Sequence, residues 1–315
     1  MNKSTKIWLN YVLGGLISVV LLVGIYLQVQ KQIARLGNDW SWQTGPNYLL
    51  YLAIALMPLN LGFEAWKWHM LAASAQRISF KQAVLSYIAG ISFSLITPNR
   101  IGEYPGRILY LKKTNTFRLV SVSILGAIAQ MLTLFLYGLA GLIYFNIKFP
   151  GTMHMLVLAG CFVVTIIVAI VYWRFETWMP LIQRIKWLKR YRYHIYGKLL
   201  NRFTPTEQTR ILLVSIVRYA TYTAQYLILL LWLKVDVPIG EGFLLCALFF
   251  WVIAVIPSVT LVELGERGQV GLYIFHHFSQ NTIGILGATV GVWCINLIVP
   301  GIIGSILLAR TKLIR

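Results

Sequence analysis

The sequence predicts an all-α, polytopic membrane protein with about six full spans and two re-entrant broken-helix hairpins in inverted halves. Hydrophobic residues make up 58% of the chain, charged residues only 12%, and the mean hydropathy is +0.71. A soluble protein of this size has no interior large enough to bury so much apolar surface. No long polar segment separates the apolar stretches, so we expect a single transmembrane domain over residues 1–315.

Six apolar stretches are long enough to cross the hydrocarbon core, which takes about 20 helical residues. They cover residues 7–27, 48–66, 119–145, 155–173, 211–232 and 283–308. The first has no small-residue cleavage site of the kind that ends a signal peptide, so we expect it to be retained as a span.

Two further apolar stretches are shorter, and each is interrupted by a proline. The first covers residues 83–97, breaks at Pro98 and resumes at 104–111. The second covers residues 243–256, breaks at Pro257 and resumes at 268–278. Proline ends a helix because it has no N–H donor and its ring clashes with the preceding turn. We therefore expect each stretch to form two half-helices.

The distribution of lysine and arginine predicts how the chain threads the membrane. If the N-terminus is cytoplasmic and both broken stretches return to the side they enter from, the opposite side receives only Lys31, Arg35, Lys148 and Lys234. This asymmetry favours cytoplasmic N- and C-termini. The two hairpins then enter from opposite faces, an arrangement typical of transporters with inverted repeats.

The basic loop at 174–210 alternates apolar and basic residues at helical spacing. Leu181, Ile182, Ile185 and Leu188 can share one face. The pattern fits a helix that lies on an anionic cytoplasmic leaflet, and it fits equally an ordinary basic loop.

Composition also bears on the classes of partner and cofactor. The net charge is +19, which in a soluble protein would suggest nucleic acid, but these basic residues lie between apolar spans, so we expect no nucleic-acid partner. Cys161, Cys246 and Cys294 lie in apolar runs without metal-ligand spacing, which favours small core residues over a metal site. The sequence contains no recognisable hydrolase, zinc-protease or nucleotide-binding motif, so we expect no cofactor and favour a transporter over an enzyme.

The first break carries the clearest candidate site, with the sequence LITPNRIGEYPGR at 95–107. Non-helical backbone at membrane depth is tolerated only inside protein or along a wet cavity, and charges there mark function. We expect hinges at Pro98, Gly102 and Gly106, and substrate-binding side chains at Arg100, Glu103 and Arg107.

The second break, IPSVTLVELGERG at 256–268, repeats these ingredients. Free N–H groups at the start of a half-helix and the forked guanidinium of arginine both suit phosphate. Here we expect hinges at Pro257 and Gly265, and substrate contacts from Glu263 and Arg267. Glu266 is either part of the site or an ion-pair partner that closes the hairpin.

Two full spans also carry charge. Arg218 lies in a polar stripe with Ser215, Tyr222 and Gln225, so we add it to the substrate-binding candidates. Glu64 precedes the sequence AWKW, and we interpret this group as an interfacial anchor.

At the two breaks the sequence resembles the lysylphosphatidylglycerol synthase transmembrane-region family, the flippase-like membrane half of aminoacyl-phospholipid synthases. Pro98, Gly102, Glu103 and Arg107 match the first motif of that family. The second motif is matched less closely, through Glu263, Gly265 and Arg267. The resemblance implies a stand-alone member without the soluble synthase domain, located in the bacterial cytoplasmic membrane.

The leading hypothesis is a flippase or scramblase-like translocase for an anionic, aminoacylated or polyprenyl-linked lipid. One alternative is a membrane enzyme that acts on a lipid phosphate, with the carboxylates as acid and base. Another is a membrane anchor for a separately encoded lipid-modifying enzyme.

Overall fold

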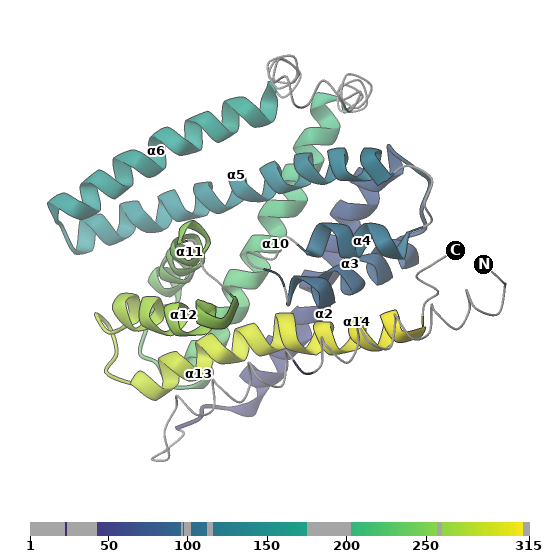
Figure 1. Ribbon diagram of the computed structural model, residues 1–315. Helices are drawn as coiled ribbons and strands as arrows, with labels where there is room; N and C mark the ends of the chain where they lie inside the picture. Colours follow the sequence, from purple (N-terminus) through teal and green to yellow (C-terminus); the bar gives the residue numbers. More distant parts are fainter. Residues whose placement is uncertain are drawn as a thin grey trace.

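The computed structural model describes residues 23, 43–95, 97, 102–111, 116–174, 203–256 and 260–310, and every regular element in these residues is a helix (Figure 1). In chain order they are α2 (Asn47–Ala73), α3 (Phe80–Ser94), α4 (Glu103–Tyr110), α5 (Thr116–Lys148), α6 (Thr152–Trp173), α10 (Pro205–Trp232), α11 (Ile239–Val255), α12 (Thr260–Phe275), α13 (Thr282–Trp293), the π-helix η2 (Cys294–Ile298) and α14 (Val299–Arg310).

Five helices in this part of the chain are long and apolar enough to cross a membrane. They are α2, α5, α6, α10 and the continuous helix from Thr282 to Leu308. The chain is therefore an all-α, multi-pass membrane protein, as predicted. The sixth expected span, 7–27, and most of the basic 174–210 loop lie outside the described residues.

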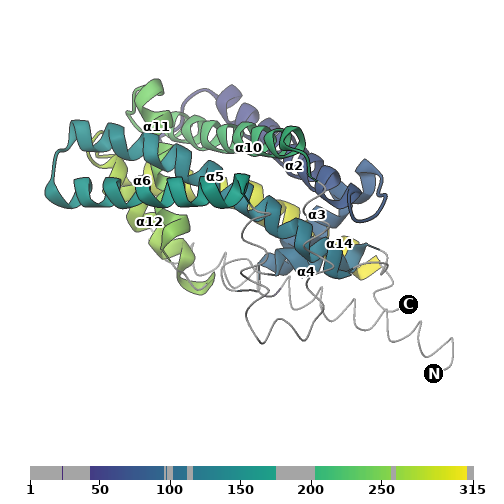
Figure 2. The same cartoon turned by 90° about the horizontal axis from the view of Figure 1, so that it is seen from above.

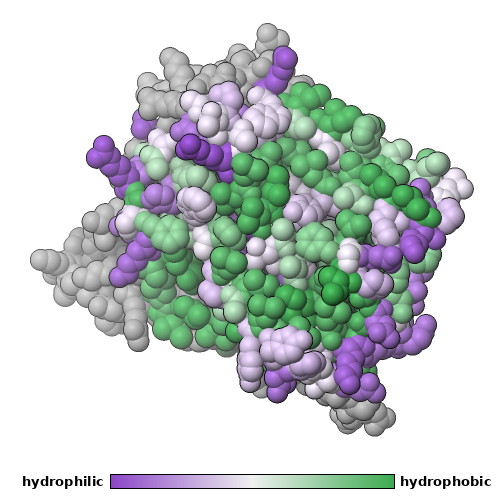
Figure 3. Space-filling view, turned by 180° about the vertical axis from the view of Figure 1, so that it is seen from behind, coloured by the Kyte–Doolittle hydropathy of each residue, from purple (hydrophilic) through white to green (hydrophobic). Residues whose placement is uncertain are grey.

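The long helices form the frame of the molecule. α5 and α6 run side by side as an antiparallel pair, and α2 packs along α10 (Figures 1 and 2). The space-filling view shows apolar residues across the middle of one face and polar residues toward its edges (Figure 3). Large side chains such as Phe162 and Ile167 are about half exposed, at 53% and 52%, which suits contact with lipid chains.

The first broken stretch forms α3 and α4, which pack directly against each other. α3 starts with a capping box, in which Ser79 Oγ accepts from the Gln82 backbone and Gln82 Oε1 accepts from the Ser79 backbone. Glycines permit the close approach, because a Cβ on Gly106 would lie 2.9 Å from Gly90 Cα. Gly106 thus lies inside α4 as a packing residue, not in the break.

The second broken stretch forms α11 and α12, which also pack together. Here the structure corrects the predicted boundary, because helix resumes at Thr260 and not at 268. The residues from Glu263 to Gly268 therefore belong to α12. Leucine and glutamate are good helix formers, and a single glycine is tolerated within a helix.

The last span has a π-helical segment at its middle, η2, between α13 and α14. Such wide turns occur mostly as single insertions and often at functional sites. On the C-terminal side of η2, α14 packs against α3, where Ser92 Oγ donates to Gly301 O at 2.8 Å. The last span thereby holds the first broken pair in place.

Candidate functional site

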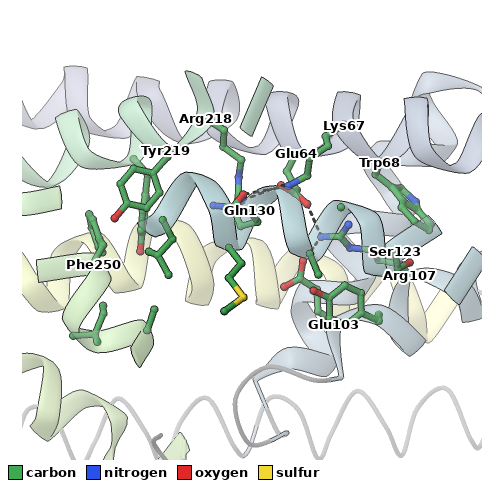
Figure 4. Close-up of a pocket in the computed structure, with 18 of the residues that line it drawn as sticks. Glu64, Lys67, Trp68, Glu103, Arg107, Ser123, Gln130, Arg218, Tyr219 and Phe250 are labelled. Atoms are coloured by element: carbon green, nitrogen blue, oxygen red, sulfur yellow. Dashed lines mark hydrogen bonds and ion pairs between the residues drawn. The ribbon is translucent and has the colours of Figure 1, made fainter. Parts of the chain in front are cut away.

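Glu64 lies at the centre of a buried cluster of charges between helices. Its Oε2 lies 2.7 Å from Lys67 Nζ and 2.9 Å from Arg218 Nη1, and its Oε1 lies 2.9 Å from Arg107 Nη2 (Figure 4). We call Glu64, Lys67, Glu103, Arg107 and Arg218 the Glu64 cluster. It joins α2, α4 and α10.

Arg107 is, with Lys67, one of the two almost fully buried cations of the cluster. Its Nη2 also pairs with Glu103, one turn earlier on α4. Its guanidinium carbon lies 4.7 Å from the ring centre of Tyr87 and 5.5 Å from that of Trp68, so aromatic faces cover it. Ser86 Oγ donates to the Arg107 carbonyl at 2.8 Å and accepts from Trp68 Nε1 at 3.1 Å. These contacts fix the position of α4 against α2 and α3.

Gln130 on α5 connects the two remaining cations. Its Oε1 accepts from Lys67 Nζ at 3.2 Å and from Arg218 Nη1 at 3.0 Å. Arg218 Nη2 also donates to Tyr87 OH at 3.4 Å. Lys67 and Arg218 are thus both shared between a carboxylate and an amide oxygen.

A cavity of about 600 Å³ opens beside the cluster, within the usual size range of small-molecule sites. One end is polar, and Figure 4 shows its charged side chains converging beside Gln130. The other end is apolar and aromatic, with Tyr219 and Phe250 on the opposite side of the view. The apolar end is lined by Met131, Leu134, Tyr219, Tyr222, Phe250, Ile253, Ala254, Val255 and Ile256.

Two guanidinium groups at the polar end keep an unused donor. Nε of Arg107 and Nε of Arg218 are buried and donate no hydrogen bond within the described residues. Buried donors in native proteins nearly always have a partner. Three lysine and arginine side chains of the cluster face two carboxylates, so the polar end is best suited to an anion.

The structure brings four predicted site residues to this cavity: Glu103, Arg107, Arg218 and Arg267. Arg267 reaches it from α12 and is 6% exposed. Gly102 ends the first break as the residue before α4, and its N–H donates to Thr97 Oγ1 at 2.8 Å. Gly265 lies within α12. Pro98, Arg100, Pro257 and the side chain of Glu263 lie outside the described residues.

Sequence reasoning did not include three residues of the site: Glu64, Lys67 and Gln130. α2 continues to Ala73, so Glu64 and Lys67 lie within the helix and are buried, in place of the expected interfacial anchor. Their signal was the spacing of Asn60, Glu64 and Lys67 by four and three residues, which puts three polar side chains on one helix face.

A polar network lies one helical turn from Glu64. The Ala53 carbonyl accepts a hydrogen bond from Gln225 Nε2 at 2.7 Å. The Val292 carbonyl accepts one from Asn296 Nδ2 at 3.0 Å. Because carbonyls only accept, these bonds fix the orientation of both amides. Asn296 Nδ2 then donates to Gln225 Oε1 at 2.7 Å, and Asn60 Nδ2 donates to Asn296 Oδ1 at 2.8 Å. Asn296 is part of η2, so the network ties the π-helix to α2 and α10.

Comparison with known proteins gives one family. The model described as "Lysylphosphatidylglycerol synthase TM region" matches residues 11–304, nearly the whole chain. No curated protein matches the chain. The match agrees with the resemblance seen at the two breaks.

Proposed function

The chain belongs to the lysylphosphatidylglycerol synthase TM-region family, and on that basis we propose that it is a translocase that moves an anionic membrane lipid between leaflets. The family and the apolar helices make it a membrane protein linked to lipid metabolism. The translocase role is more specific than a link to lipid metabolism. Its main support is the cavity beside the Glu64 cluster, which has one polar end and one apolar end.

The polar end suits a lipid phosphate. Arg107 and Arg218 each have a buried Nε donor to offer, Lys67 adds positive charge beside them, and Arg267 lines the same cavity from α12. Charge-assisted bonds from guanidinium to phosphate are among the strongest hydrogen bonds in proteins. Inside a membrane such charges are costly unless they serve a ligand or a partner.

The apolar end suits the first part of a lipid tail. Its rim residues Met131 and Val255 are exposed, at 44% and 46%, so the cavity opens between α5 and α11 beside apolar side chains. A headgroup held at the Glu64 cluster therefore has an apolar route for its chains. We propose that these chains remain in the bilayer while the headgroup occupies the cavity.

The two broken helix pairs supply the transport framework in this proposal. α3 with α4 and α11 with α12 would enter the bilayer of the cytoplasmic membrane from opposite faces as inverted repeats. Glu103 and Arg107 come from one pair and Arg267 from the other, and all three line the same cavity. Sites at the junction of discontinuous helices are common in transporters.

A flip assay in proteoliposomes tests the proposal. The vesicles contain phosphatidylcholine and a fluorescent phosphatidylglycerol, and a membrane-impermeant quencher reports which leaflet holds the label. We expect wild type to move the label, and the double variant Arg107→Ala, Arg218→Ala to slow it to the protein-free rate. Arg77→Ala is the matched control, because Arg77 is exposed between α2 and α3. Equal rates for the double variant and wild type would refute the proposed site.

A further inference from the structure

Glu64 occupies the position that a bound anion would take. Three cations surround its carboxylate: Arg107 Nη2 donates to Oε1 at 2.9 Å, and Lys67 Nζ and Arg218 Nη1 lie 2.7 Å and 2.9 Å from Oε2. Its side chain is only 5% exposed. The protein therefore carries its own carboxylate among the cations that the proposed function assigns to the lipid phosphate.

We propose that the lipid phosphate displaces Glu64 from Lys67 and Arg218, and that Glu64 takes up one proton when this happens. The inference rests on the proposed function and adds a coupled ion to it. The proton comes from the solution by way of water that reaches the cavity: an O–H bond of hydronium breaks, an O–H bond forms on Glu64, and no bond of the lipid is broken.

The proton is required by the cost of burying an unpaired charge. Lys67, Arg107 and Arg218 carry three positive charges against two negative ones on Glu64 and Glu103, which leaves one positive charge in the cluster. Once Lys67 and Arg218 turn to the phosphodiester, Glu64 and Glu103 are left with Arg107 as their one cation in the cluster. Two carboxylates against one guanidinium carry one negative charge too many, and Glu64, the more buried of the two, becomes protonated. The lipid anion and the proton enter together, so the cluster keeps its one positive charge.

The groups that face Glu64 leave one clear acceptor for the new O–H. They are Lys67 on α2, Glu103 and Arg107 on α4, Arg218 on α10, Tyr87 on α3 through its contact with Arg218, and Gln130 on α5. Gln130 Oε1 and Glu64 Oε2 contact the same two nitrogens, Lys67 Nζ and Arg218 Nη1, each at 3.2 Å or less. When the donors turn away, protonated Glu64 can donate to Gln130 Oε1.

Proton uptake on binding tests this inference directly. Purified protein in weakly buffered neutral detergent is mixed with dioctanoyl phosphatidylglycerol, whose phosphodiester keeps one negative charge across the pH range used. A pH-indicator dye reports protons, and titration calorimetry reports affinity. We expect wild type to take up about one proton per lipid, and its affinity to rise about tenfold for each unit that the pH falls.

Two carboxylate variants assign the proton. Glu64→Gln should bind the lipid without proton uptake and with an affinity independent of pH. Glu241→Gln, whose native side chain is 33% exposed and lies outside the cavity lining, should keep the proton uptake of wild type. If Glu64→Gln fails to fold, as judged by circular dichroism and gel filtration, the presence or absence of proton uptake by wild type still decides the matter.

The possible outcomes separate the two proposals. Binding by wild type without proton uptake, or equal uptake by Glu64→Gln, would overturn the coupling and leave the lipid site in place. No binding of phosphatidylglycerol by wild type, or equal binding of dioctanoyl phosphatidylcholine, would overturn the proposed anionic-lipid site itself.

Discussion

Arg218 Nη1 lies 2.9 Å from Glu64 Oε2, so an ion pair joins the two long helices α10 and α2, which are also joined by the hydrogen bond from Gln225 Nε2 to the Ala53 carbonyl. Arg218 is also the more open of the two guanidinium groups in the Glu64 cluster, with its side chain 22% exposed against 5% for Arg107. This combination makes Arg218 the cation best placed to leave its carboxylate for a ligand.

We expect Arg218→Met to weaken the binding of dioctanoyl phosphatidylglycerol by tenfold or more. A hydrogen bond to a charged group contributes about 1.5–3 kcal/mol, and methionine keeps most of the side-chain volume. Titration calorimetry gives the affinities. Arg210→Met on the same helix is the control, because Arg210 is exposed and lies outside the cavity lining. An equal loss in both variants would contradict a specific role for Arg218.

The contact between α3 and α4 predicts a clear effect at Gly106. A Cβ there would lie 2.8 Å from Phe93 Cδ2 as well as close to the α3 backbone, so Gly106→Ala must push the helices apart. Overpacking of this kind costs about 1–3 kcal/mol of unfolding free energy. Unfolding in mixed detergent and dodecyl sulfate measures it.

Gly160 on α6 provides the matched control for that change. A Cβ there meets nothing within 4 Å. Gly160→Ala should leave stability unchanged or raise it by about 0.5–1 kcal/mol through helix propensity. If Gly106→Ala were as stable as Gly160→Ala, the close packing of α4 on α3 would be wrong.

The amide network at η2 should contribute to stability. Asn296→Ala removes the partner of Asn60 Nδ2 and of Gln225 Oε1, and each unsatisfied buried group costs about 1–3 kcal/mol. We expect a lower thermal midpoint in detergent. Asn47→Ala, at the exposed start of α2, should behave as wild type. A similar midpoint for both variants would show that the network contributes little.

Single cysteines test the proposed re-entrant path of α3 and α4. In a background without the three native cysteines, Arg77→Cys and Lys112→Cys flank this helix pair, and both should react with an impermeant maleimide only from the cytoplasmic side. Met153→Cys, exposed at the start of α6, should react only from the other side. Labelling of positions 77 and 112 from opposite sides would mean that the pair crosses the membrane.

Helix types and positions followed from hydropathy, because apolar length and proline position are local properties of the chain. The breaks near Pro98 and Pro257 were predicted in this way, and α3, α4 and α11 lie close to the expected ranges. The start of α12 was missed because the charged sequence VELGERG suggested a loop, whereas its residues have adequate helix propensity.

The site was predictable only in part, because ion pairs join residues far apart in the chain. Arg107 and Arg218 were identified as charges in apolar surroundings, which is a local signal. Glu64 and Lys67 have the same signal, but the adjacent tryptophans suggested a membrane boundary. Gln130 is uncharged, and only its contacts with two distant cations reveal its role.

The spacing of Glu64 and Lys67 bears on how the protein is made. Because the two residues are three apart on one helix and 2.7 Å from each other, α2 can enter the lipid bilayer during synthesis with its opposite charges already balanced. Arg107 and then Arg218 emerge from the ribosome later and join a pair that is already formed. The charge cluster can therefore assemble stepwise, without a lone ion ever facing hydrocarbon on α2.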